Sequence, residues 1–303
     1  MSTKVLLVGI NDYPAAPLRG CVNDALAMRD TLTAAYAVAP TSIRMLLDSA
    51  ATTAAIEDGL HWLAQPDEGE RTPVRLFHFS GHGTVVADAS GDEPDGQDEC
   101  IVPFDYLTAG PMNDDTLRAL YREFPRSMHL LLVMDSCHSG TVQRNLERDI
   151  SYRFLPADHE EEQQIIAAAE RVRREREAFA WECYRRLAER SRSEEELKQQ
   201  FKALLASFDK KHYGQENVRG NVVLLAACKS SQTAADARIG GTFHGALTYY
   251  LLETLRDAGG PVSYRVLINR VGKRLYDNQF VQEPQIECNR ANRDHAFLRP
   301  IGV

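Results

Sequence analysis

Five short apolar runs, separated by segments of helical periodicity, constrain the fold of this 303-residue chain more than any other feature. They are rich in Leu and β-branched residues, as strands buried on both faces of a sheet usually are, and lie at 5–10, 43–47, 74–80, 128–135 and 221–226. Apolar residues at helical spacing lie between or after them, at 20–36, 52–65, 114–124, 242–257 and 263–277. Alternating strands and helices predict an α/β fold with a mostly parallel central sheet covered by helices on both faces.

The composition is that of a soluble globular protein, with 44% hydrophobic residues, 26% charged residues and a net charge of −8. The acidic balance argues against a nucleic-acid partner, which would favour a basic face. No apolar run approaches the length of a membrane-spanning helix, and the N-terminus reaches Asp12 too early for a secretory signal. We therefore expect a cytoplasmic protein without a membrane partner.

The six cysteines show no paired spacing, so reduced thiols are expected and a structural zinc site is not. The sequence also lacks the glycine-rich phosphate-binding motifs of nucleotide-binding α/β domains. In α/β sheets the functional residues lie beyond the carboxyl ends of the strands, and the search for chemistry therefore turns to the residues that follow the apolar runs.

Residues 144–216 differ from the rest of the chain, because they are charge-dense and contain no strand pattern. Two amphipathic helical patterns occur there, and Ser193 to Glu196 has the Ser-x-x-Glu form of a capping box that would start the second helix. We predict a helical hairpin inserted into the α/β unit. It is either a solvated decoration or a surface that docks a partner.

His82 and Cys137 follow two of the predicted strands, which end at Ser80 and Asp135. Both residues therefore fall on the edge of the sheet where functional residues are expected. A cysteine attacks carbonyl carbons as a thiolate and needs a base, and histidine is the side chain best suited to that role near neutral pH. The backbone N–H groups of Gly83 and Cys137 are candidates for holding the developing oxyanion. Either side chain alone would more often be structural, but together they predict a Cys–His dyad.

Several segments together resemble the caspase-like cysteine peptidases, most closely their prokaryotic metacaspase, or orthocaspase, branch. The matching segments are VLLVGINDY (5–13), LRGCVNDA (18–25), FHFSGHG (77–83), DGQDECIVPFDY (95–106), VMDSCHSG (133–140) and GGTFHGALTYYLLETL (240–255). The resemblance implies a caspase-hemoglobinase-like three-layer fold in a single peptidase domain. Its parts would be a large-subunit-like part (1–143), the helical insertion or linker (144–216) and a small-subunit-like part (217–303).

The resemblance also implies roles for the site residues. Cys137 would be the nucleophile that forms an acyl-enzyme, and His82 would be the general base and acid. The pocket for P1, the residue whose carbonyl is attacked, would be formed by Asp135, Asp24, Cys21 and Ser80. Two carboxylates suit a cationic side chain, so the implied function is a cysteine endopeptidase that cleaves proteins or peptides after Arg or Lys. From its position alone, Asp24 is equally well explained as a first-turn helix residue stabilised by the macrodipole.

No cofactor is required for this chemistry, but the resemblance raises the question of calcium. Carboxylates that match metacaspase calcium ligands stand at Asp98, Asp114 and Asp115, whereas a further ligand position falls near Arg144, which cannot bind a cation. The alternative is that Asp114 or Asp115 caps a helix, and that Asp98 belongs to a polar hairpin.

The resemblance further implies a zymogen whose linker is cleaved, by the protein itself or by an upstream activating protease. The candidate cleavage sites are Arg144, Arg148, Arg153 and Arg219. The alternative is that these arginines only decorate an exposed loop. A monomer is expected, and the rival function is a catalytically silent caspase-fold module that docks a partner through the helical insertion.

Overall fold

The computed structural model describes residues 3–67, 69, 73–91, 93–137, 150–188, 190–191, 193–212, 220–229 and 232–299. His138 and three predicted cleavage sites, Arg144, Arg148 and Arg219, lie outside these residues. The chain divides into two compact units. Unit 1 comprises Met1–Thr84, Cys100–Pro156 and Asn217–Val303, and unit 2 comprises Val85–Glu99 and Ala157–Glu216.

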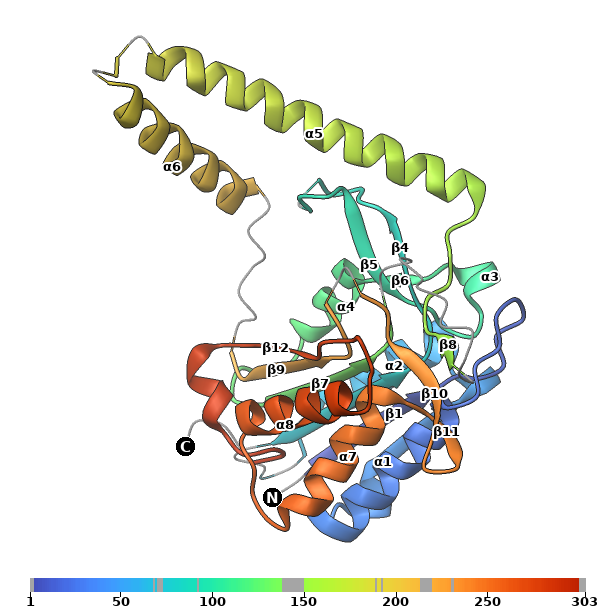
Figure 1. Cartoon of the computed structure of the whole chain (residues 1–303). Helices are drawn as coiled ribbons and strands as arrows, with labels where there is room; N and C mark the ends of the chain where they lie inside the picture. The colour runs from blue at the N-terminus through green and yellow to red at the C-terminus, as the bar shows by residue number, and fades with distance from the viewer. Residues whose placement is uncertain are drawn as a thin grey trace. The chain divides into compact units, whose positions relative to one another are not determined.

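A six-stranded sheet forms the centre of unit 1 (Figure 1). Its strands, in spatial order, are β12 (Gln285–Cys288), β9 (Val222–Ala226), β7 (His129–Asp135), β3 (Val74–Ser80), β1 (Thr3–Gly9) and β2 (Ile43–Leu47). All neighbouring pairs are parallel except β12 with β9, so the predicted mostly parallel sheet is confirmed. The register aligns Gly9 with Ser80 and Ser80 with Asp135. The segments that follow these three strands therefore start from one edge of the sheet.

Helices cover both faces of the sheet, which gives the predicted three layers. One face is covered by α1 (Cys21–Tyr36), α7 (Ala246–Ala258) and α8 (Tyr264–Asp277), and the other by α2 (Thr53–Ala64) and α4 (Asp114–Tyr121). Successive strand residues point to opposite faces of the sheet. Leu7 therefore lies in the core between the sheet and α1, α7 and α8, and Leu6 lies in the core on the face covered by α2 and α4. The side chains of Thr52, Asn113 and Ser263 accept backbone N–H groups at the starts of α2, α4 and α8.

Apart from the two helices of the insertion, the remaining elements are short. One small sheet contains β4 (Gly83–Ala87), β5 (Gln97–Ile101) and β6 (Met112–Asn113), and another contains β8 (Ile150–Tyr152), β10 (Ala235–Ile239) and β11 (Thr242–Gly245). The other helical turns are α3 (Tyr106–Ala109), η1 (Pro40–Ser42), η2 (Asp48–Ala50) and η3 (Arg290–Asp294). Strands β8 and β11 both pair antiparallel with β10, and this pairing places Tyr152 opposite Ala235.

The helix predicted over 242–257 is wrong at its start, because Thr242–Gly245 form β11 and α7 begins at Ala246. The cause is the preceding turn. Gly240 and Gly241 have φ values of 62° and 98°, which glycine adopts at little cost. The turn sends the chain back along β10, where hydrogen bonds to a distant segment override the local apolar periodicity.

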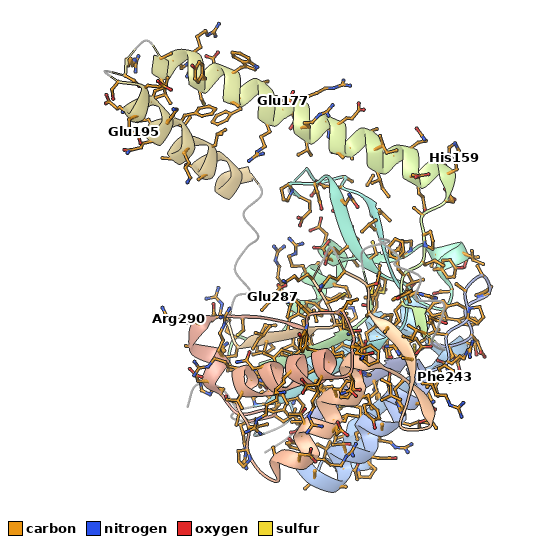
Figure 2. The ribbon with its side chains drawn as sticks, in the orientation of Figure 1. His159, Glu177, Glu195, Phe243, Glu287 and Arg290 are labelled. Atoms are coloured by element: carbon orange, nitrogen blue, oxygen red, sulfur yellow. The ribbon has the colours of Figure 1, made fainter. Side chains whose placement is uncertain are left out.

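Unit 2 contains the predicted helical hairpin, formed by α5 (His159–Ala188) and α6 (Glu194–His212). The predicted capping interaction is present, since the Glu196 N–H donates to Ser193 Oγ at 3.2 Å. Exposed charged side chains line α5, and Glu177, labelled in Figure 2, is one of them. This pattern is typical of a solvated helix.

Residues 150–156 belong to unit 1, although they fall inside the predicted 144–216 insertion. The second unit resumes only at Ala157. No helix within the described ranges combines the length and the apolar character that a bilayer crossing needs.

The contact between β1 and α1 yields a stability prediction. A Cβ on Gly9 would lie 2.5 Å from the backbone oxygen of Cys21, so Gly9→Ala must push α1 away from the sheet. We expect Gly9→Ala to lower the free energy of unfolding in urea by about 1–3 kcal/mol. The matched control is Gly272→Ala in α8, where the new Cβ would lie 3.6 Å from Pro284 Cγ. It should stabilise the chain by up to about 1 kcal/mol through helix propensity. Equal effects of the two variants would contradict this packing.

Candidate active site

His82 is held in one orientation by its surroundings. It follows β3 and is 1% exposed, and its Nε2 lies 2.6 Å from the carbonyl oxygen of Ala16. A carbonyl can only accept, so Nε2 carries the proton and Nδ1 keeps a lone pair. The Tyr13 hydroxyl accepts the backbone N–H of His82 at 3.1 Å and donates to the Val102 carbonyl at 2.7 Å. Among the described residues Nδ1 of His82 is buried without a partner, and is therefore available as a base.

Burial sets the protonation state of His82. It lowers the pKa of His82 from its usual 6.5 to about 4, although the hydrogen bond to Ala16 opposes this shift. The nearby positive charge of Arg153 lowers the pKa further. The imidazole is therefore neutral near pH 7, which is the form that can accept a proton.

Cys137 follows β7 and is fully buried. Its Sγ lies 3.8 Å from the Sγ of Cys228 and also contacts the backbone N–H of Ala234. Both candidate catalytic residues are therefore at the carboxyl edge of the sheet, as the sequence predicts.

The backbone of Arg153 lies between these two residues. Its carbonyl oxygen accepts hydrogen bonds from the N–H groups of Gly83, at 2.9 Å, and Cys137, at 3.3 Å. These are the two donors predicted for the oxyanion. The N–H of Arg153 donates to the Ala234 carbonyl at 3.1 Å, which continues the pairing of β8 with β10. An internal peptide unit thus occupies the position expected for a reacting carbonyl.

The guanidinium of Arg153 lies among three carboxylates, and all four side chains are fully buried. Its Nη2 is 2.7 Å from Asp24 Oδ2 and 3.1 Å from Asp236 Oδ1. Its Nη1 is 3.3 Å from Asp135 Oδ1 and donates to Ser80 Oγ at 2.7 Å. The structure thus brings together three of the predicted P1-pocket residues.

Cys21, the fourth predicted pocket residue, is buried at the start of α1. Burial raises the pKa of its thiol well above the usual value, and its side chain also interacts with Ser80. The thiol is therefore neutral, and Cys21 contributes a small uncharged side chain to the predicted pocket.

Backbone N–H groups fix the carboxylates in place. Asp135 Oδ2 accepts the N–H of Thr248 at 2.8 Å and its hydroxyl at 2.7 Å. Asp24 Oδ2 accepts the N–H of Gly245 at 2.9 Å. Asp236 accepts the N–H of Gly20 at 3.0 Å. These donors orient the three carboxylates toward one point.

The charges balance only in part. Burial alone would raise the pKa of Asp24, but Arg153 and several hydrogen bonds hold this pKa below its usual value. Burial raises the pKa of Asp135, although Arg153 opposes the shift. Burial alone would lower the pKa of Arg153, but the surrounding acids raise it, so the guanidinium stays charged. The three carboxylates therefore suit a side chain that always carries a positive charge, as arginine does.

Asp236 was not among the residues predicted from the sequence. The available signal is an acid inside the short strand Ala235–Ile239, because an acid that is buried needs a partner. The alternative view of Arg153 as an exposed decoration is wrong, because this side chain is fully buried.

The three residues proposed as calcium ligands are not among the carboxylates that contact Arg153. Asp98 is buried in β5. Asp114 and Asp115 lie in the first turn of α4 and pair with Arg118, and the cap of this helix is Asn113 rather than either acid. Over the described part of the chain, no three His, Cys, Asp or Glu side chains are grouped to hold a metal ion. Calcium binding stays a prediction.

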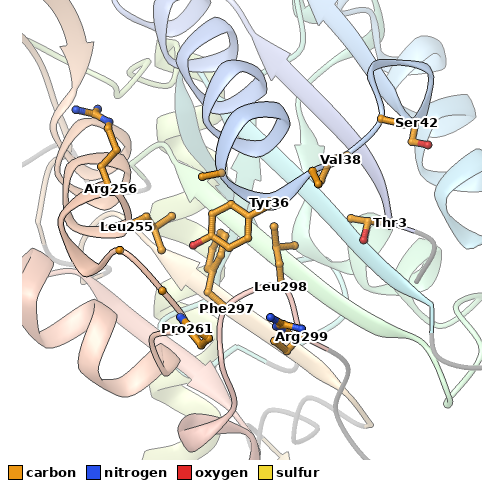
Figure 3. Close-up of a pocket in the computed structure, with 15 residues that line it drawn as sticks. Thr3, Tyr36, Val38, Ser42, Leu255, Arg256, Pro261, Phe297, Leu298 and Arg299 are labelled. Carbon is orange, nitrogen blue, oxygen red and sulfur yellow. The ribbon is translucent and has the colours of Figure 1, made fainter.

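A cavity of about 830 Å³ lies away from this site (Figure 3). Its lining includes Thr3, Tyr36, Leu255 and Phe297, from the start of β1, the ends of α1 and α7, and the C-terminal segment. Because β1 begins at Thr3, the cavity lies at the amino end of the strands, opposite to His82 and Cys137.

The protonation of His82 provides a test of this geometry. Compared with Cys137→Ala, the double variant Cys137→Ala/Arg153→Gln lacks a nearby cation, so the pKa of His82 should rise above about 4. A ¹H NMR titration of the histidine Cε1–H signals measures this shift. His129, whose pKa burial also lowers to about 4, is the internal control and should not move. An unchanged pKa for His82 would contradict the proximity of Arg153.

Comparisons with known proteins agree with this architecture. The family model of the caspase domain matches residues 2–295. Metacaspase-1B of Aspergillus oryzae is 31% identical over 296 residues, covering 94% of this chain and 67% of the relative. Metacaspase-1B of Aspergillus niger is 30% identical over 307 residues, covering 94% of this chain and 64% of the relative. The chain thus spans about two thirds of the length of these curated relatives.

A crystal structure of a protein from Geobacter sulfurreducens has the same fold, with a TM-score of 0.64, 24% identity and full coverage of both chains. The two named relatives are fungal, so membership of a prokaryotic branch stays a prediction. The matched family model and the metacaspase relatives together show that the chain belongs to the caspase domain family of cysteine-type endopeptidases.

Proposed function

We propose that this chain is an arginine-specific cysteine endopeptidase that uses Cys137 as nucleophile and His82 as general base and acid. The observation that carries the proposal is the placement of Arg153. Its side chain is bound by three acids, while its carbonyl oxygen accepts the N–H groups of Gly83 and Cys137. The same residue thus has its side chain bound by the acids and its carbonyl oxygen bound by the proposed oxyanion donors.

We infer the following reaction. Nδ1 of His82 takes the thiol proton of Cys137, and the thiolate attacks the carbonyl carbon of the P1 arginine. The N–H groups of Gly83 and Cys137 stabilise the oxyanion. The imidazolium, whose Nε2–H is held by Ala16, then gives its proton to the leaving amine as the C–N bond breaks. Water activated by His82 hydrolyses the acyl-enzyme and restores the thiol.

Arginine fits this pocket better than lysine. The two terminal nitrogens of Arg153 reach Asp24 and Asp236 on one side, and Asp135 with Ser80 on the other. A lysine offers one terminal nitrogen, so it would leave at least one buried acid without its partner. The pocket therefore favours Arg over Lys at P1.

The first prediction of this proposal concerns P1. We expect kcat/KM for a peptide with Arg at P1 to exceed that of the matched Lys peptide by about 10-fold or more. Asp236→Asn should lower kcat/KM for the Arg peptide by about 10- to 100-fold, because an acceptor of the P1 guanidinium loses its negative charge. Cys137→Ala is the control for contaminating activity. Absence of any Cys137-dependent turnover would favour the alternative of a catalytically silent module.

The linker supplies a second prediction. With Arg153 in the P1 position, the bond in place for attack is Arg153–Phe154, and its cleavage by the chain itself would free the pocket for other substrates. We expect the purified chain to yield a fragment that begins at Phe154, detected by N-terminal sequencing and intact mass. Arg153→Gln should abolish this cut, and Cys137→Ala should leave a single chain.

The matched control is Arg173→Gln, since Arg173 is an exposed arginine of α5. This variant should be cut like the unaltered chain. A cut at Arg153 that persists in Cys137→Ala would point to an upstream protease instead. An intact chain with full activity toward peptides would contradict activation by cleavage.

A further inference from the structure

We propose that this site also binds the two residues that follow the scissile bond, P1′ and P2′, through Gly83 and Thr84. The inference rests on the proposed function, because it treats residues 150–155 as a substrate lying across the site. It adds a binding site on the leaving-group side of the cleaved bond. Substrates would therefore be polypeptides that continue past the arginine, and not arginine amides alone.

Backbone contacts on the leaving-group side carry the inference. Phe154, in the P1′ position, forms a parallel β-bridge with Gly83. The N–H of Leu155, in the P2′ position, donates to the Gly83 carbonyl at 2.9 Å. The hydroxyl of Thr84 donates to the Leu155 carbonyl at 2.7 Å. Both backbone polar groups of P2′ are thus bound by two consecutive residues at the start of β4.

Gly83 links this side of the bond to the catalytic centre. Its N–H donates to the carbonyl oxygen of Arg153 at 2.9 Å, and its carbonyl accepts the N–H of Leu155 at 2.9 Å. One residue therefore holds the chain on both sides of the Arg153–Phe154 bond. A substrate anchored at P2′ would have its scissile carbonyl positioned at the oxyanion donors.

The hydroxyl of Thr84 is the group that would bind the P2′ carbonyl. The side chain is buried, at 6% exposure, and a buried hydroxyl needs an acceptor. Its acceptor here is a backbone carbonyl, which every residue type at P2′ would present. Recognition through Thr84 therefore selects for chain length beyond the arginine rather than for one side chain.

The side chains of these residues add an apolar preference. Phe154 packs partly buried against the core that contains Cys137, and Leu155 packs against the core that contains Tyr13. Burying such side chains is favourable, and burying a charged one without a partner is not. We therefore infer that the substrates carry apolar residues at P1′ and P2′.

The experiment compares peptides that share one leaving residue. The parent peptide has the chain's own sequence, Ile-Ser-Tyr-Arg-Phe-Leu, with blocked ends. The second peptide ends as the amide of Phe, so it lacks the P2′ carbonyl that Thr84 would bind. The third carries N-methyl-Leu at P2′, which removes the donor to Gly83. In the unaltered enzyme, N-methylation should lower kcat/KM by about 3- to 10-fold, as expected for one hydrogen bond. The Phe amide also lacks the Leu side chain, so its kcat/KM should fall by at least as much.

Thr84 is tested with two variants. Thr84→Val removes the hydroxyl and should reduce the preference for the parent peptide over the Phe amide by about 3- to 10-fold. Thr84→Ser keeps the hydroxyl and should retain the preference. Because the ratio of two substrates is measured on one preparation, partial misfolding of a variant cancels.

The outcomes separate the two proposals. Cleavage after Arg with equal kcat/KM for all three peptides would overturn the P2′ site and leave the peptidase standing. An unchanged ratio in Thr84→Val would overturn the role of Thr84 in the same way. Failure of Cys137-dependent cleavage of every peptide would overturn the proposed function itself, and this inference with it.

Discussion

The buried guanidinium of Arg153 is the interaction on which the rest of the site depends. Asp24 comes from α1, Asp135 from β7 and Asp236 from β10, and all three carboxylates are buried. Three acids without water or a cation would repel one another at a cost of several kcal/mol. The arginine therefore joins three elements that are distant in the sequence. The site in this form is stable because it is occupied.

Side-chain contacts alone would not distinguish a bound substrate from a structural ion pair. The proposal that Arg153 lies as a substrate rests instead on its backbone, whose N–H donates to the Ala234 carbonyl and whose carbonyl accepts the N–H groups of Gly83 and Cys137. Buried backbone groups of any residue need partners, so the relevant point is which groups donate to this carbonyl: the N–H groups of Gly83 and Cys137, beside His82 and at the candidate nucleophile. Contacts to both polar groups of the peptide unit are what an enzyme needs to position a carbonyl for attack.

Local patterns predicted five of the six strands of the central sheet, all but β12, because buried parallel strands have a strong apolar signal. They also placed His82 and Cys137 after two of these strands. The family resemblance supplied Asp24 as a pocket residue. Asp236 and the β8 strand were missed, because Asp236 lies in β10, and β10 and β8 pair with each other across a long stretch of sequence. The start of α7 was wrong for the same reason, since the pairing of β11 with β10 is set by the Gly240–Gly241 turn.

Under the proposed function, strand register determines which bond lies at Cys137. Side chains alternate along an extended chain, so a slip of one residue would turn Arg153 away from the acids and bring Tyr152 or Phe154 toward them. The pairing of β8 with β10 fixes the register before the arginine, and Gly83 fixes it after the arginine. In the proposed function, the three acids then bind the side chain that this register places among them. The proposed selection of the cleavage position thus combines backbone hydrogen bonds, which do not depend on side-chain identity, with a carboxylate cluster that requires a cationic side chain.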